Sequence, residues 1–133
     1  MGKKVIHFAK WVSGVFLLDR VTKIMVQRYL VEGESIPVIK NILHLTYYRN
    51  PGAAFNLLAY RTGFFIVVAL VVLAVIVYYY GKIPGDKVYA RTALALQFGG
   101  VSGNLVDRVF GGYVIDFLDF RIWPVFNIAD SAI

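Results

Sequence analysis

An uninterrupted apolar run in the middle of the chain limits the folds open to this sequence more than any other feature. The residues from Gly63 to Tyr80 carry no charge, and a helix of about 20 apolar residues crosses the hydrocarbon core of a bilayer. Three tyrosines end the run, as is typical where a helix meets the lipid headgroups. We therefore predict a transmembrane helix over residues 62–81, and a membrane protein as the class.

The composition of the whole chain agrees with this class and argues against several kinds of site. Hydrophobic residues make up 59% of the sequence, above the roughly 45–50% of soluble domains. The net charge of +6 is expected of basic residues that flank membrane segments, and no basic stripe with interleaved aromatic residues indicates a nucleic-acid partner. Because the chain has no cysteine and its two histidines are far apart, we predict no disulfide, no metal site and no cofactor.

Two further segments, residues 6–30 and 88–109, are predicted to be membrane helices with polar positions. In the first, Asp19 and Lys23 are four residues apart and can form an ion pair on one side of a helix. The pair either stabilises an interfacial helix or forms a polar patch that supports a site inside a bundle, and the other membrane helices favour the bundle. In the second, Gly99 and Gly103 form a GxxxG pair that permits close helix contact.

The remaining segments are predicted to lie outside the membrane. Residues 31–61 combine two prolines and two glycines with β-branched and aromatic runs, which predicts a small extramembrane sheet. Residues 110–125 leave the membrane again, and a fourth span would begin near residue 126, so we expect the sequence, which stops at Ile133, to contain only its start. Three lysines within the first ten residues favour an N-terminus inside the cell, which places both segments outside it.

Carboxylates are concentrated near the end of the chain, where four of the eight acidic residues lie between residues 99 and 133: Asp107, Asp116, Asp119 and Asp130. Two carboxylates that share a site can hydrolyse an amide, because the ionised one removes a proton from water while the protonated one polarises the carbonyl. Since the sequence has no metal-ligand set, no cysteine and no Ser–His relay, an aspartyl mechanism is favoured if the protein is an enzyme.

Spacing alone does not select the reactive pair. Asp107 is followed by Arg108, which we expect to hold it ionised in a structural role. Asp116 and Asp119 are three residues apart, and either can contribute. Asp119, close to Arg121, fits a solvated loop carboxylate best.

Four blocks of the sequence resemble the type II signal peptidase (lipoprotein signal peptidase) family of membrane aspartyl enzymes. They are DRVTK at 19–23, RNPGAAF at 49–55, GGVSGNLVDRVFGGYVIDFLDF at 99–120 and FNIADSAI at 126–133. The resemblance implies that Asp116 and Asp130 form the catalytic dyad. It further implies supporting roles for eight residues: Asp19, Lys23, Asn50, Gly52, Asn104, Asp107, Arg108 and Asn127.

The resemblance also implies a fold and a substrate. The fold is an all-α membrane bundle of four helices with a small extracytoplasmic β-sheet cradle and a lid-like periplasmic helix, here as one domain over residues 1–133 with the fourth span truncated. The substrate is a diacylglyceryl-modified prolipoprotein, cleaved on the N-terminal side of its lipidated cysteine. We expect a monomer in the lipid of the bacterial inner membrane, with its site toward the periplasm. The alternatives are a small proton-coupled transporter or channel that uses the same acids, and an inactive truncated fragment of the peptidase.

Overall fold

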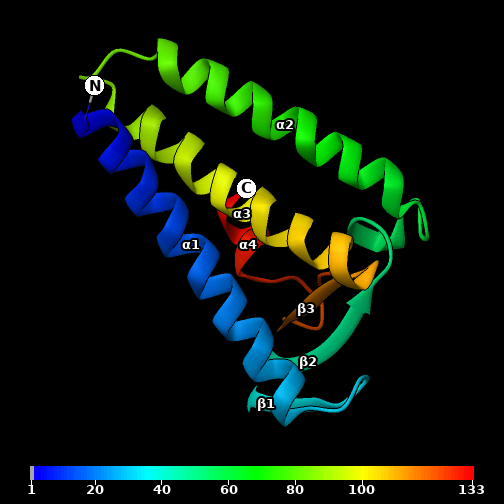
Figure 1. Cartoon of the computed structure of the whole chain (residues 1–133). Helices are drawn as coiled ribbons and strands as arrows, with labels where there is room; N and C mark the ends of the chain where they lie inside the picture. The colour runs from blue at the N-terminus through cyan, green and yellow to red at the C-terminus, as the bar shows by residue number, and fades with distance from the viewer. Residues whose placement is uncertain (1) are drawn as a thin grey trace.

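A computed structural model describes residues 2–133 and shows three long helices above a small sheet (Figure 1). The elements in chain order are α1 (Gly2–Tyr29), β1 (Ser35–Ile39), β2 (Leu43–Asn50), the 3₁₀ turn η1 (Ala54–Asn56), α2 (Thr62–Lys82), α3 (Val88–Gly111), β3 (Val114–Asp119) and α4 (Ile128–Ala132). The helices thus begin and end close to the ranges predicted for the first three spans, and α4 begins two residues after the predicted start of the fourth.

Helix α3 is the centre of the arrangement, with α1 and α2 on either side of it and α4 also packed against it (Figure 1). The GxxxG pair allows the close approach to α1. A Cβ atom at Gly99 would lie 3.0 Å from the carbonyl oxygen of Val12, and one at Gly103 would lie 2.5 Å from Asp19 Oδ2. The sequence prediction that these glycines serve helix contact is therefore confirmed.

Within residues 2–133, α2 is the one helix that is long and apolar enough to cross a membrane by length and composition. Its outer face exposes a row of large apolar side chains that includes Val67, Val71 and Val75, as suits a helix that faces lipid. Helices α1 and α3 have 28 and 24 residues, but the charges they carry leave no comparable apolar stretch. The three long helices are therefore observed, whereas the four-span bundle stays a prediction.

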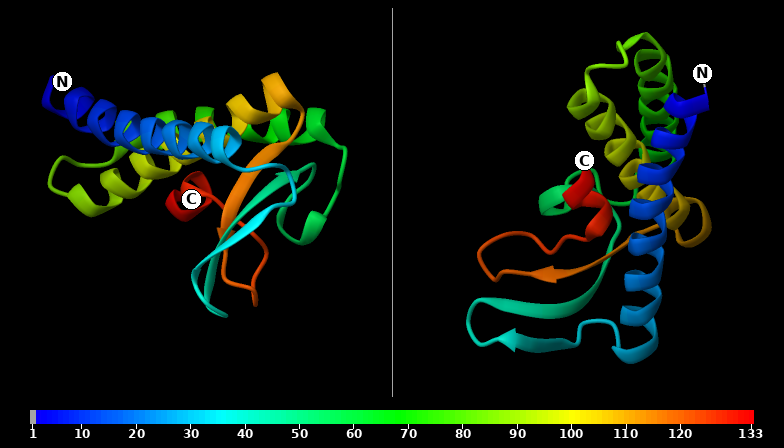
Figure 2. Two further views of the ribbon diagram at one scale, coloured as in Figure 1. Left: turned by 90° about the horizontal axis from the view of Figure 1, so that it is seen from below. Right: turned by 90° about the vertical axis from the view of Figure 1, so that its left-hand side faces the viewer.

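The sheet is antiparallel, in the order β1-β2-β3, and it extends away from one end of the helices (Figure 2). The β1–β2 hairpin lies in the segment predicted to form a sheet. Strand β3 does not, because it comes from residues 114–119, for which the sequence predicted only a segment outside the membrane. Ile115 and Phe117 of β3 pack with Tyr47 of β2 and with Val26 and Leu30 at the end of α1.

The turn after β2 is irregular, and the lid-like periplasmic helix, which the resemblance implied without placing it in the sequence, stays a prediction. The segment after β2 contains one 3₁₀ turn, η1, and three residues other than glycine have a positive φ angle: Phe55 (57°), Leu58 (53°) and Tyr60 (66°). Such angles are uncommon for residues with a side chain. The segment therefore forms a tight loop over the end of the sheet rather than an α-helix.

Candidate active site

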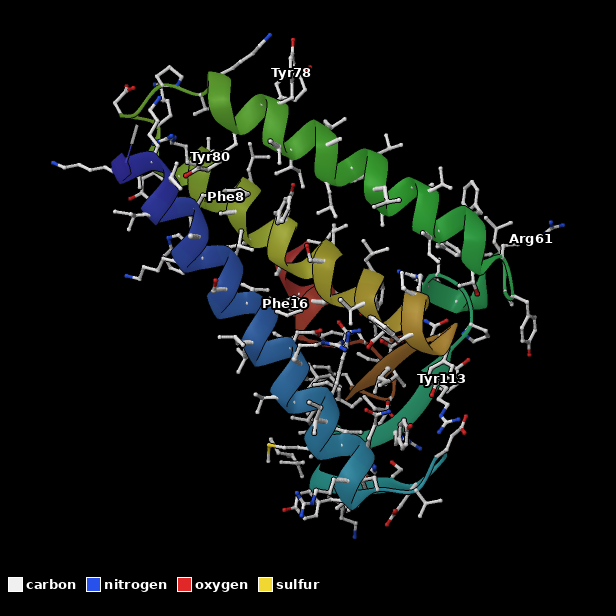
Figure 3. The ribbon with its side chains drawn as sticks, in the orientation of Figure 1. Phe8, Phe16, Arg61, Tyr78, Tyr80 and Tyr113 are labelled. Atoms are coloured by element: carbon white, nitrogen blue, oxygen red, sulfur yellow. The ribbon has the colours of Figure 1, made fainter. Side chains whose placement is uncertain are left out.

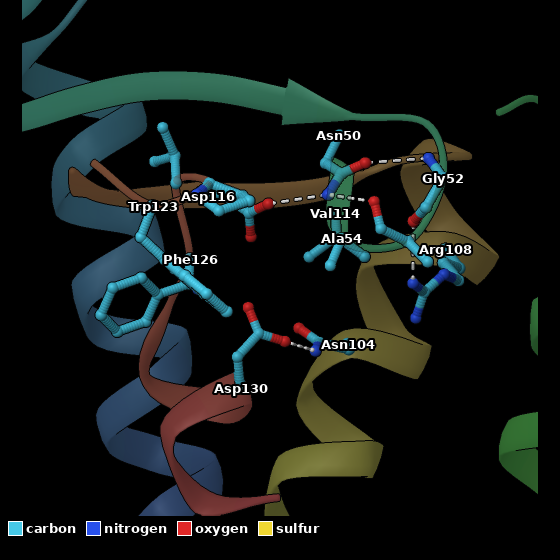
Figure 4. Close-up of a pocket in the computed structure, with 13 residues that line it drawn as sticks. Asn50, Gly52, Ala54, Asn104, Arg108, Val114, Asp116, Trp123, Phe126 and Asp130 are labelled. Carbon is cyan, nitrogen blue, oxygen red and sulfur yellow. Dashed lines mark hydrogen bonds between the residues drawn. The ribbon is translucent and has the colours of Figure 1, made fainter. Parts of the chain in front are cut away.

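The two predicted catalytic carboxylates line one cavity of about 200 Å³, although they come from different elements (Figure 4). Asp116 is in the middle of β3 and Asp130 is in the first turn of α4. The other walls come from α3, from the turn after β2 and from the segment between β3 and α4. The lining residues are Asn50, Gly52, Ala53, Ala54, Asn104, Arg108, Val114, Asp116, Trp123, Pro124, Val125, Phe126 and Asp130.

Asp116 is the buried member of the pair, with 1% of its surface exposed. Its Oδ2 accepts a hydrogen bond from Asn50 Nδ2 at 3.0 Å, and its Oδ1 accepts one from Asn127 Nδ2 at 2.8 Å. Burial, together with the nearby charge of Asp130, raises the pKa of Asp116 to about 7, and the two amide hydrogen bonds only partly oppose that rise. Asp116 therefore changes its protonation state near neutral pH, as a general acid requires.

Asp130 is the exposed member of the pair, and it is held by the start of α4. Asn127 caps this helix, because its Oδ1 accepts from the backbone N–H of Asp130 at 2.8 Å while its own N–H donates to Asp130 Oδ2 at 3.1 Å. This reciprocal capping box fixes the carboxylate relative to the helix. The three-residue spacing of Asn127 and Asp130 is thus the spacing of a helix cap.

Three asparagines turn their amide N–H groups toward the two carboxylates, and the partner of each Oδ1 sets that orientation. Asn104 Oδ1 accepts from Lys23 Nζ at 2.9 Å, so its Nδ2 donates to Asp130 Oδ1 at 2.8 Å. Asn127 Oδ1 is taken by the helix cap. Asn50 Oδ1 accepts from the backbone N–H of Gly52 at 2.9 Å, which leaves its Nδ2 for Asp116. Asn50, to which the resemblance assigned a supporting role, thus holds the buried carboxylate.

A buried cluster of four charges lies beside the cavity, between α1 and α3. Lys23 Nζ is 2.9 Å from Asp19 and 2.8 Å from Asp107, and Arg20 contacts the same two carboxylates at 3.0 and 2.6 Å. Asp19 and Lys23 are completely buried. The two positive and two negative charges neutralise each other, and a buried cluster of charges is stable only when its charges are paired in this way.

The charge cluster also connects to the two elements that carry the dyad. Asp19 Oδ1 accepts from the backbone N–H of Ala129 in α4 at 3.1 Å, and Asp107 Oδ2 accepts from that of Ile115 in β3 at 3.1 Å. The cluster therefore fixes α4 and β3 relative to α1 and α3. It confirms the polar patch inside the bundle that the Asp19–Lys23 spacing predicted.

The expected pairing of Asp107 with Arg108 is wrong. Neighbouring residues of a helix point about 100° apart, so Asp107 faces α1 and pairs there with Lys23 and Arg20, whereas Arg108 faces the cavity. Arg108 Nη2 donates to the carbonyl of Gly52 at 3.3 Å, and its guanidinium lies 4.8 Å from the ring centre of Phe65.

Gly52 occupies a position where the backbone leaves no room for a side chain. A Cβ atom there would lie 2.5 Å from the carbonyl oxygen of Leu57. The close approach at this turn is made by the chain itself. Gly52 therefore holds the loop against the cavity through its contacts with Asn50 and Arg108.

Asp119 lies on the opposite side of β3 from Asp116, because residues three apart in a strand point to opposite faces. Its Oδ2 accepts from Thr46 Oγ1 at 2.8 Å and from Arg121 Nη1 at 3.0 Å, and its Oδ1 accepts from the Arg121 backbone. Partial burial raises the pKa of Asp119, but these hydrogen bonds and the charge of Arg121 outweigh that effect and hold it below its usual range. The structure thus separates two aspartates that spacing did not.

The comparisons with known proteins agree with the resemblance drawn from the four sequence blocks. A family model described as "Signal peptidase (SPase) II" matches residues 11–133. The chain belongs to the signal peptidase II family. Within this family it is 50% identical over 119 residues to a lipoprotein signal peptidase of Moorella thermoacetica, covering 90% of this chain and 79% of the relative. It is 54% identical over 120 residues to one of Desulfitobacterium hafniense, covering 90% of this chain and 80% of the relative.

Two solved structures share the fold of this family member. One is a bacterial membrane enzyme determined by the in meso method at 2.3 Å resolution, with a TM-score of 0.89, 34% identity, and coverage of 99% of this chain and 80% of the other. The second, a bacterial membrane enzyme at 1.9 Å resolution, has a TM-score of 0.85, 34% identity, and coverage of 99% and 85%.

Some residues of the site were not singled out from the sequence of this signal peptidase II family member. Arg20 appeared only as a member of the block DRVTK, yet it pairs with two buried carboxylates. Trp123 and Phe126 line the cavity, and the only sequence signal was that Trp123 lies between the third and fourth blocks and that Phe126 begins the fourth. Among residues 2–133, no group of three or more His, Cys, Asp or Glu side chains is arranged to hold a metal ion.

Proposed function

We propose that the protein is an aspartyl endopeptidase that removes the signal peptide from diacylglyceryl-modified prolipoproteins, on the N-terminal side of the lipidated cysteine. The observation that carries the proposal is that Asp116 and Asp130 line one cavity with only amide hydrogen bonds to hold them. The relatives from M. thermoacetica and D. hafniense are both lipoprotein signal peptidases. Their function fits a site that can supply one acid and one base.

In the proposed reaction, Asp130 is the general base and Asp116 is the general acid. Ionised Asp130 takes a proton from water as the oxygen attacks the scissile carbonyl carbon, while protonated Asp116 gives its proton to the carbonyl oxygen. The C–N bond then breaks as Asp130 passes its proton to the leaving nitrogen, and Asp116 recovers a proton from the hydroxyl of the collapsing intermediate. The raised pKa of Asp116 and the open position of Asp130 support this division of roles.

The supporting residues act in the proposal through the two carboxylates. Asn104 and Asn127 aim the dyad, and Asn50 holds Asp116 from the side of the β2 turn. Asp19, Lys23 and Asp107 fix the elements that carry it, and Gly52 and Arg108 shape the cavity wall.

We further propose that residues 1–133 form one membrane domain of a monomer in the bacterial inner membrane. Helices α1, α2 and α3 correspond to the first three spans, α4 begins the fourth, and the sheet and the loop after β2 lie on the periplasmic side. Basic residues near the N-terminus and in the α2–α3 turn support this orientation. The dyad then meets a lipidated substrate at the outer membrane surface.

The test is cleavage of a synthetic diacylglyceryl-modified prolipoprotein peptide by the purified protein, with the products identified by mass spectrometry. The expected result is one cut before the lipidated cysteine, lost in Asp116→Asn and in Asp130→Asn. Asp119→Asn is the matched control and retains substantial activity, since its carboxylate faces away from the cavity. Equal loss in all three variants would refute the assignment of the dyad. Proton or solute flux in proteoliposomes without any cleavage would instead favour a transporter.

A further inference from the structure

A separate cavity of about 340 Å³, with basic residues in its wall, lies at the end of the helices opposite the sheet. It is formed by the N-terminal turns of α1, the α2–α3 turn and the start of α3, and it is lined by Lys3, Lys4, His7, Gly85, Val88 and Arg91. Figure 1 shows the N-terminus and the α2–α3 turn side by side at this end, away from β1–β3. The cavity shares no residue with the one that holds the dyad.

Arg91 is a buried cation in the wall of this cavity that lacks hydrogen-bond acceptors. Only 5% of its surface is exposed, and its Nε and Nη2 atoms have no hydrogen-bond partner among residues 2–133. The guanidinium lies 4.8 Å from the ring centre of Tyr80. The face of an aromatic ring offers no acceptor in the plane of the guanidinium, where its N–H groups donate. Buried donors without acceptors are costly in a folded protein, so a ligand that supplies oxygen acceptors would be stabilised here.

The electrostatic surroundings of the cavity all favour an anion. Six basic residues and one acidic residue lie toward this end of the three long helices, and together they account for +5 of the net charge of +6. They are Lys3, Lys4, Lys10, Lys82, Lys87, Arg91 and Asp86. Asp86 is exposed, and it takes part in none of the ion pairs within residues 2–133.

The amino end of α3 adds a further positive contribution. This 24-residue helix has no acidic residue in its first turn and no side chain that caps it. The N–H of Val88 donates to the carbonyl of Asp86 at 2.9 Å, and the dipole of the helix places partial positive charge at this end, where Val88 forms part of the cavity wall.

The walls of the cavity are fixed by contacts between the three long helices. Tyr80 Oη of α2 donates to the carbonyl of Lys4 in α1 at 2.9 Å, and His7 Nε2 is hydrogen-bonded to Thr92 Oγ1 of α3 at 3.1 Å. Phe8 packs against Tyr80, with ring centres 4.5 Å apart (Figure 3). These contacts hold the walls before a ligand arrives, which lowers the ordering cost of binding, and the Arg91 side chain has to shift to present its enclosed Nε and Nη2 atoms.

We propose that this cavity binds a phosphate group, with Arg91 as its buried donor and Lys3 and Lys4 at its mouth. Arg binds phosphate oxygens in a fork of two parallel hydrogen bonds, and Nε and Nη2 of Arg91 are the two nitrogens of such a fork. Both atoms are enclosed by the protein, so a phosphate in the cavity reaches them through a shift of the Arg91 side chain. The phosphate belongs either to the headgroup of an anionic phospholipid, as expected for a basic pocket at a membrane surface, or to free phosphate.

The experiment measures binding by native mass spectrometry of the full chain in a neutral detergent. Separate titrations use phosphatidylglycerol, diacylglycerol with the same acyl chains, and inorganic phosphate. Wild type is compared with Arg91→Gln and with the double variant Lys3→Gln/Lys4→Gln, whose side chains lie at the mouth of the cavity. Lys40→Gln, in the exposed β1–β2 turn, is the matched control for loss of a positive charge.

The expected result is preferential binding of phosphatidylglycerol over diacylglycerol, weakened about fivefold for each cation removed at the cavity and unchanged in Lys40→Gln. Binding of inorganic phosphate that competes with the lipid and is weakened in the same variants would assign the site to free phosphate. Equal binding of phosphatidylglycerol and diacylglycerol by wild type, with no binding of inorganic phosphate, would overturn the proposal. Unaltered binding in both cavity variants would also overturn it. Cleavage is not measured, so the outcome is independent of the proposed peptidase activity.

Discussion

Replacing Asp116 by asparagine is expected to change how the stability of the protein depends on pH. The folded state raises the pKa of this carboxyl from 3.8 to about 7, first by burial and then through the charge of Asp130. The folded protein therefore binds this proton more tightly than the unfolded chain does. The stability contributed by the proton is fully present below about pH 4, falls as the pH rises, and is lost above about pH 7.

The size of the effect follows from the shift of about three pKa units. Each unit corresponds to about 1.4 kcal/mol, so the ionised Asp116 costs the folded state about 4 kcal/mol at pH 8 relative to pH 4. Asp116→Asn cannot ionise and avoids that cost. Its new amide places N–H groups opposite the N–H groups of Asn50 or Asn127, which lowers the stability of the variant by an amount that does not depend on pH. The change of stability with pH is therefore a cleaner measure than its value at one pH.

The assay is unfolding in detergent, followed at half-unit steps between pH 4.5 and 8. The free energy of unfolding of Asp116→Asn minus that of wild type is expected to rise by about 1.4 kcal/mol per pH unit between pH 5 and 6.5 and then to level off. Asp119→Asn is the control. The pKa of Asp119 is held below its usual range, so its stabilising effect is lost only as the pH falls below about 4, and its difference from wild type stays flat. A flat difference for Asp116→Asn as well would refute the reasoning.

Two further variants test the packing and the charges behind the dyad. Gly103→Ala places a Cβ 2.5 Å from Asp19 Oδ2 and is expected to lower the free energy of unfolding by about 1–3 kcal/mol. The control Gly14→Ala meets nothing within 4 Å and leaves that free energy unchanged or raises it by up to about 1 kcal/mol. Similar thermal unfolding of the two variants would contradict the close contact. Lys23→Met leaves Asp19 and Asp107 with an excess negative charge and is expected to cost about 3–5 kcal/mol in denaturant unfolding, and a loss below about 1 kcal/mol would show that Arg20 alone balances both carboxylates.

The helices of this protein were predictable because each depends on a local pattern. The uncharged run that became α2 decides its own structure by length, and the two glycines of α3 decide its contact with α1. Partners across elements were harder to predict. Arg108 follows Asp107 in the sequence but points elsewhere on the helix, and Arg20 of α1, far away in the chain, takes its place.

Strand β3 shows why the dyad needed the family resemblance. Its residues are buried on both faces, so VIDFLD lacks the simple alternation of buried and exposed positions that indicates a strand. Without the strand, Asp116 and Asp119 are equivalent acids three residues apart. Once the segment pairs with β2, they point to opposite faces, and only Asp116 meets the cavity.

The contacts of the five aspartates other than Asp86 supply a criterion that neither burial nor spacing supplies. Three of them lie within 3.0 Å of a lysine or arginine nitrogen: Asp19, Asp107 and Asp119. Each of these three carboxylates is balanced by an ion pair, which suits a structural role. No such ion pair reaches Asp116 or Asp130 within residues 2–133, and their partners are neutral amides and a backbone N–H. These two carboxyls are therefore the ones free to exchange a proton, and Lys23, which donates to Asn104 while it neutralises Asp19 and Asp107, connects the two groups without forming an ion pair with either member of the dyad.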